Sequence, residues 1–213
     1  MKKNNKGTNI KNTIYKHISN NIKEYTLVVL LFIIGVFLGV MFINNSQEEQ
    51  INELTSYINN FVEKFKSTED LNIFELLKSS ILQNVILAIS LWFFGTTVIG
   101  IPIVFGIVLY RGFCLGYTIA AITTIMGLGK GISFVLVTLL LQNIILIPAM
   151  IAIAVSGYKL YKSIVKNRDK ENIKVEILRH TVFSLIMLVL LCIASVVEIL
   201  VSTNILKKII KYF

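Results

Sequence analysis

The residues of this chain that could do chemistry are few and lie within apolar stretches. Arg111 and Glu198 are charged residues inside such stretches, and Gln142 with Asn143 forms an amide pair inside another. A charge at membrane depth is costly and usually faces protein or water, whereas a buried amide usually bonds a neighbouring helix. Arg111, Gln142 and Asn143 are therefore the candidates for a polar path through a membrane or for a structural role, whereas Glu198 can reach the outer headgroups.

The motifs that the sequence lacks point away from catalysis. It has no G-x-S-x-G or H-E-x-x-H motif, no paired carboxylates in one apolar segment and no nucleophile beside a histidine. Cys114 and Cys192 lie in apolar segments without metal-site spacing, and His17 and His180 are isolated near segment ends, which we interpret as interfacial positions. We interpret the Gly-rich run 127–131 as a tight turn, because it lacks the Ser or Thr and the preceding strand of a phosphate loop. We expect no enzyme, no metal, no cofactor and no nucleic-acid partner.

Composition and apolar block length indicate a membrane protein. The chain is 55% hydrophobic and only 15% charged, whereas a soluble domain carries about 25% charged residues. Apolar blocks of roughly 17 to 25 residues can each cross hydrocarbon. We predict an all-α polytopic protein, a single integral membrane domain over residues 1–213. Its five expected transmembrane helices are Leu27 to Ile43, Ile81 to about Gly100, about Gly112 to Met126, Ile132 to about Gly157 and Thr181 to about Thr203.

Charge predicts the orientation. Residues 1–26 and 158–179 are basic, and residues 44–78 are acidic. Because cytoplasmic loops carry the excess of Lys and Arg, we expect both basic segments in the cytoplasm. The acidic segment and the C-terminus are then extracytoplasmic. The N-terminal segment either lies as an amphipathic helix on anionic lipid or only sets the orientation.

The acidic segment 44–78 has the pattern of an amphipathic helix. Ser46 and Glu49 have capping-box spacing. Apolar residues then recur at three- and four-residue intervals, as on one face of a helix: Ile51, Leu54, Ile58, Phe61, Val62 and Phe65. Two interpretations stay open. The stripe either packs on the protein's own spans or the membrane surface, or it binds an extracytoplasmic partner, and we predict these six as partner-binding residues.

Small residues at two places predict close helix packing. Gly35 with Gly39, and Gly112 with Gly116, have the G-x-x-x-G spacing that lets two helix backbones approach. We predict all four at helix contacts, and they also make a homodimer plausible.

Residues 101–111 are too few for a span and too apolar for an ordinary loop, so we predict a bent or partly re-entrant connection near the inner interface. There Arg111 either snorkels to headgroups or binds carbonyls freed around Pro102. Glu198 comes seventeen residues after Thr181, where the last expected span begins at the inner face. It should therefore lie roughly 25 Å further out than Arg111. We therefore expect no direct Arg111–Glu198 pair. Gln142 and Asn143 either bond neighbouring helices or line a transport path.

Several short motifs occur here in an order that a known family shares. They are Gln83-Asn84, Pro102, Tyr110 to Gly116, Leu141 to Ile144 with Pro148, and Arg179-His180. With the five-span plan and the charged segment after the first span, the chain resembles the stage II sporulation protein M family of spore-forming Firmicutes over most of its length.

The resemblance implies a non-enzymatic function. Such proteins are thought to hold two peptidoglycan hydrolases, stage II sporulation proteins D and P, at the septal membrane while the mother cell engulfs the forespore. We therefore expect a multi-pass scaffold of the cell membrane, at the septal or engulfing membrane, that acts in peptidoglycan remodelling. The alternative, from other members of the wider family, is a component of a permease-like or transport assembly.

Overall fold

The computed structural model describes residues 18–67, 73–136, 139, 141–166 and 170–202, and these contain helices and no strand. In chain order the helices are α2 (Ile22–Asn44), α3 (Glu48–Ser67), α4 (Ile73–Gly95), α5 (Ile101–Met126), α6 (Leu128–Val135), α7 (Leu141–Lys166), α8 (Lys170–Val197) and the short π-helix η2 (Glu198–Ser202). Five stretches are long and apolar enough to cross a membrane: α2, α4, α5, residues 143–165 of α7 and residues 173–201 of α8 and η2. The predicted all-α, five-span, multi-pass plan is confirmed.

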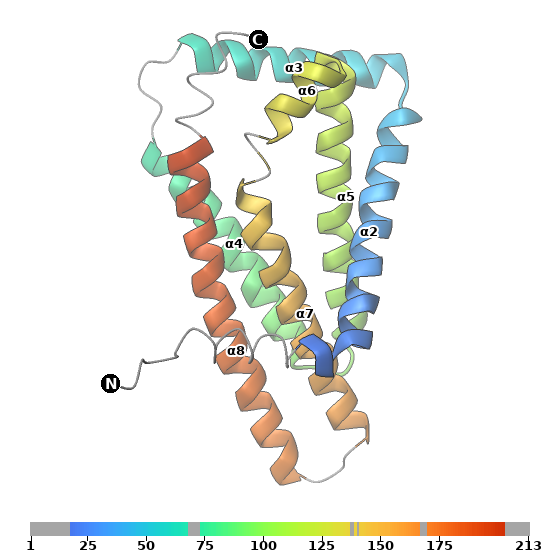
Figure 1. Cartoon of the computed structure of the whole chain (residues 1–213), viewed down its shortest axis with the longest axis vertical. Helices are drawn as coiled ribbons and strands as arrows, with labels where there is room; N and C mark the ends of the chain where they lie inside the picture. Colours follow the sequence, from blue (N-terminus) through green and yellow to red (C-terminus); the bar gives the residue numbers. More distant parts are fainter. Residues whose placement is uncertain (1–17, 68–72, 137–138, 140, 167–169, 203–213) are drawn as a thin grey trace, which may run out of the picture.

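The five long helices form a bundle, and α3 lies across one of its ends (Figure 1). The short helix α6 lies at the same end, which we call the α3 end. The α4–α5 turn lies at the opposite end, which we call the turn end. The core between the helices is apolar and fully buried, with Val28 of α2, Leu91 of α4, Val108 of α5, Met150 of α7 and Leu191 of α8 at its centre.

The predicted re-entrant connection over residues 101–111 is wrong, because α5 is one continuous helix from Ile101. Pro102 lies in its first turn, where the missing N–H costs no intrahelical bond. Only residues 96–100 connect α4 to α5. There the hydroxyls of Thr96 and Thr97 donate to the Phe93 and Phe94 carbonyls, which also accept the backbone N–H groups of Thr96 and Thr97 at the end of α4.

The predicted basic loop 158–179 is also largely helical. α7 continues to Lys166 and α8 begins at Lys170, so both helices run past the apolar residues. Lys162 makes a 2.8 Å ion pair with Glu24 near the start of α2 and lies 5.0 Å from the centre of the Tyr158 ring. These contacts stabilise helical backbone where composition alone suggested a loop.

The predicted turn at residues 127–131 is shorter than expected. Among the described residues only Gly127 has a positive φ, of 77°, and α6 begins at the next residue. The candidate fourth span therefore begins only at Asn143, within α7.

The four predicted packing glycines lie at one contact, between α2 and α5 of the same chain. A Cβ on Gly35 or Gly39 would overlap the backbone of α5, and a Cβ on Gly112 or Gly116 would overlap the backbone of α2. Only glycine permits this approach. The surface that made a homodimer plausible is therefore covered within one chain.

Candidate functional site

The apolar stripe of α3 packs against the helix bundle. Ile51 and Leu54 pack against a buried cluster that includes Ala121, and Ile58 packs against a second one that includes Ile122. All three stripe residues are half-buried. Of the two interpretations of the stripe, packing on the protein's own spans describes these three, and they are not free to carry a partner. The side chains of Phe61, Val62 and Phe65 lie outside the described residues.

The opposite face of α3 is polar and exposed. Viewed along the helix, it lies half a turn from the stripe. Its residues are Glu49, Asn52, Glu53, Ser56, Asn60 and Glu63. The Ser56 hydroxyl donates to the Asn52 carbonyl of its own helix. Helix α3 therefore forms a fixed platform with an acidic, hydrogen-bonding outer surface, which we call the α3 outer face.

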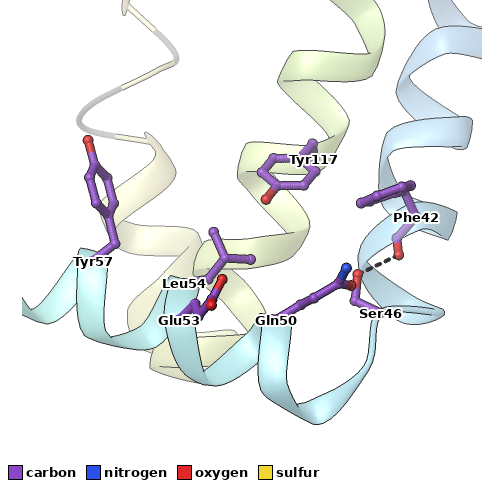
Figure 2. A pocket seen from close by; sticks show the side chains of 7 residues that line it. All are labelled: Phe42, Ser46, Gln50, Glu53, Leu54, Tyr57 and Tyr117. Carbon is purple, nitrogen blue, oxygen red and sulfur yellow. Dashed lines mark hydrogen bonds between the residues drawn. The ribbon is translucent and has the colours of Figure 1, made fainter.

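A groove opens beside this platform, where α3 passes the ends of α2 and α5. Its volume is about 460 Å³, and it is lined by Phe42, Ser46, Gln50, Glu53, Leu54, Tyr57 and Tyr117. Figure 2 shows the three aromatic rings around the opening and Glu53 with Gln50 along α3. Sequence reasoning missed this groove because three separate helices build it. The only available signal was the presence of aromatic residues near the ends of apolar segments.

A second group of polar residues lies within the spans, where α4 meets α8 and η2. The Ser80 hydroxyl donates a 2.7 Å hydrogen bond to the Glu198 carboxylate. One turn further along α4, the buried Asn84 amide donates to Ser195 Oγ at 2.7 Å. Arg111 of α5 is an electrostatic neighbour of Glu198. We call Ser80, Asn84, Arg111, Ser195 and Glu198 the intramembrane polar cluster.

The distance estimated between Arg111 and Glu198 assumed helix starts that differ from those in the structure. The estimate placed Arg111 at the inner end of a span that began near Gly112. In the structure α5 begins at Ile101, so Arg111 lies about 15 Å along its helix. Helix α8 likewise begins earlier than expected, at Lys170, so both helix starts in the estimate change. The described residues show no ion pair between Arg111 and Glu198, in agreement with the expectation that the two do not pair directly.

The family membership follows from the sequence as a whole. A family model described as Stage II sporulation protein M matches residues 28–203, from within α2 to just past η2. The chain belongs to the stage II sporulation protein M family. It is therefore a sporulation-related membrane protein. No curated protein and no solved structure matches it significantly.

In this member of the stage II sporulation protein M family, the two residues of the motif Gln83-Asn84 differ in burial. Asn84 is only 1% exposed, and its amide also lies 3.3 Å from the Leu191 carbonyl. Gln83 is exposed. Asn84 Oδ1 is buried without a hydrogen-bond partner in the described part of the chain. Asn84 is therefore a buried polar residue of the cluster.

His180 is buried between helices, with only 1% of the residue exposed. Its Nδ1 lies 2.9 Å from Ser156 Oγ on α7, and its Nε2 lies 3.4 Å from the Trp92 carbonyl on α4. Trp92 in turn donates to Thr181 on α8 at 3.1 Å. His180 thus joins α4, α7 and α8 towards the turn end. The sequence offered no signal for it because its partners come from two other helices.

Of the other predicted structural residues, Asn143 lies beside Arg111 and Pro102 does not. The Asn143 amide donates to the Leu139 carbonyl of the preceding turn at 2.8 Å. Asn143 also shares a cavity of about 110 Å³ with Arg111, Cys114 and Thr118. Pro102 lies in the first turn of α5 and does not line this cavity. The side chain of Gln142 lies outside the described residues.

Proposed function

We propose that this protein is a non-enzymatic membrane scaffold that recruits peptidoglycan hydrolases to the septal membrane during forespore engulfment. The observation that carries the proposal is the α3 platform. Ile51, Leu54 and Ile58 hold α3 on the bundle, and its outer face stays exposed and polar. The partners that we propose are stage II sporulation proteins D and P.

The distribution of charge supports the orientation that this function requires. The turn end carries Lys23, Lys162 and Arg179, and the α3 end carries Glu49 and Glu63. Under the positive-inside rule the turn end lies in the cytoplasm. The α3 end then faces the compartment that contains the peptidoglycan.

Such a platform needs only a low binding affinity for its partners. A partner anchored in the same membrane has a high effective concentration, so weak contacts suffice for recruitment. Because α3 is already ordered by its packing, partner binding costs little conformational entropy in this helix. The acidic outer face also favours basic partner surfaces over the anionic wall.

The alternative function is a transport assembly, and the intramembrane polar cluster is the observation that favours it. Glu198 begins a π-helix, a distortion that often marks functional sites. The cavity beside Arg111, however, measures about 110 Å³, whereas sites for small organic molecules measure about 300–1,000 Å³. The scaffold is therefore the better supported function.

Co-purification from sporulating cells tests the scaffold. The double variant Ser56→Arg with Asn60→Arg adds bulk and positive charge to the α3 outer face. Both residues are exposed, so we expect wild-type thermal stability and membrane insertion. We also expect loss of both hydrolases from the purified complex and a block in engulfment.

The control is Ser133→Arg, which makes the same kind of change at an exposed residue of α6, at the same end of the bundle. It should keep both hydrolases. If the α3 double variant inserts normally and still retains both hydrolases, the outer face is not the docking surface. A solute-uptake defect in a well-folded Arg111→Ala variant would favour the transport function instead.

A further inference from the structure

We propose that the groove beside α3 binds one phospholipid molecule whose headgroup carries a primary ammonium, of the phosphatidylethanolamine class. This inference goes beyond the proposed scaffold function. It rests on the two hollows that meet where α2 ends and α3 begins. One is polar and acidic, and the other runs along the apolar surface of a span.

The polar hollow has the chemistry of an ammonium site. Within the described residues the Glu53 carboxylate has no ion-pair partner, and it lines the groove of about 460 Å³. The rings of Phe42, Tyr57 and Tyr117 surround the same space (Figure 2). A carboxylate with several aromatic faces is the arrangement that recognises organic cations.

The second hollow indicates that the ligand is amphiphilic. Its volume is about 590 Å³, and it shares Phe42, Ser46 and Gln50 with the first. From there it extends over Leu38 and Met41, which belong to the candidate span α2. A molecule that occupies both hollows must have a polar head under α3 and an apolar chain that follows α2 into the bilayer.

The boundary between the two hollows suits a phosphodiester. Asn45, Gln47 and Gln50 bring three side-chain amides to this level, and each amide can donate two hydrogen bonds. Phe42, Phe113 and Tyr117 form a packed aromatic wall behind it, with ring centres 5.8 to 6.2 Å apart. The wall fixes the shape of the site without using the amides.

Charge and hydrogen bonding select the headgroup. An anionic lipid would meet Glu53 and the neighbouring Glu48 and Glu49 of the same helix, and it would be repelled. A quaternary ammonium cannot donate a hydrogen bond to Glu53. A primary ammonium can, and such charge-assisted bonds are the stronger ones. A lysine from a partner protein would match the polar hollow but would leave the apolar hollow without a function.

Thermal unfolding of the purified full-length protein in detergent tests the proposal. The probes are phosphatidylethanolamine, phosphatidylcholine and phosphatidylglycerol with identical short acyl chains. We expect the largest rise in unfolding temperature from phosphatidylethanolamine. Glu53→Gln should weaken its binding about tenfold, which corresponds to about 1.4 kcal/mol. Tyr57→Ala should also weaken it, and because Tyr57 is 73% exposed this change should not disturb folding.

The matched control is Glu49→Gln, which removes the same charge from an exposed position of α3 that does not line the groove. It should bind phosphatidylethanolamine like the wild type. Equal effects of the three lipids would mean that only acyl chains bind and would overturn the proposal. So would undiminished binding by Glu53→Gln. An equal rise from N-acetyl-lysine amide would assign the groove to a protein side chain instead of a lipid.

Discussion

Ser80 on α4 donates a 2.7 Å hydrogen bond to Glu198 at the start of η2, joining residues 118 positions apart in the chain. Arg111 on α5 is the electrostatic neighbour of the same carboxylate. This hydrogen bond therefore joins α4 to η2 at an acidic group inside the candidate spans. An ionisable residue at this depth persists where protein groups compensate its lost hydration, and this cluster supplies such groups.

We predict that the charges of Arg111 and Glu198 are thermodynamically coupled. Arg111→Gln or Glu198→Gln alone leaves the other charge without its neighbour, so each should destabilise the protein. The double variant should lose less than the sum of the two, with a coupling energy of about 0.5–3 kcal/mol. Unfolding free energies of the four proteins in one detergent measure it. Losses that add within about 0.3 kcal/mol would show that the two charges act independently.

We predict that a single methyl group at the α2–α5 contact is costly. Gly35→Ala and Gly112→Ala place a Cβ against a backbone carbonyl, and overpacking of this kind costs about 1–3 kcal/mol. The control is Gly106→Ala on the same helix, where a Cβ would meet nothing within 4 Å. It should be neutral or stabilising, because alanine favours helix. Thermal unfolding measures all three, and equal behaviour of Gly106→Ala and Gly112→Ala would contradict the packing.

We predict opposite outcomes for the neighbours Gln83 and Asn84. Asn84→Ala removes the hydrogen bonds to Ser195 and Leu191 and leaves a small buried void. It should cost about 1–3 kcal/mol. Gln83→Ala changes an exposed side chain and should stay within about 0.5 kcal/mol of the wild type. A stable Asn84→Ala variant would mean that this amide does not hold α4 to α8.

We predict that α3 and the α4–α5 turn lie on opposite sides of the membrane. Asn59 is exposed on α3, and Ile99 in the turn is 86% exposed. With Cys114 and Cys192 replaced by alanine, an impermeant thiol reagent on intact cells should label Asn59→Cys and not Ile99→Cys. Permeabilised cells should allow both reactions, which controls for reactivity. Labelling of both variants in intact cells would refute this topology.

Much of the fold follows from the sequence because hydropathy is a local property. The apolar runs of α2 and α8 identify two spans without any knowledge of their neighbours. The glycine spacing at Gly35 and Gly112 indicated close packing, although not that the two faces meet within one chain. Helix boundaries were less predictable. Residues 101–111 resemble a broken connection in composition, yet Pro102 in a first turn is compatible with an unbroken helix.

The sequence by itself determined the membrane class, the five spans and the charge difference between the two ends, since each depends on runs of residues read in order. Only the tertiary structure decided which polar groups meet. His180 is buried between α4 and α7, Glu198 accepts a hydrogen bond from Ser80, and Ile51 packs on the chain's own helices. Such contacts depend on where each helix begins and how the helices pack. An error of one or two turns in a helix start moves a side chain by about 5–11 Å, which is enough to make or break every one of them.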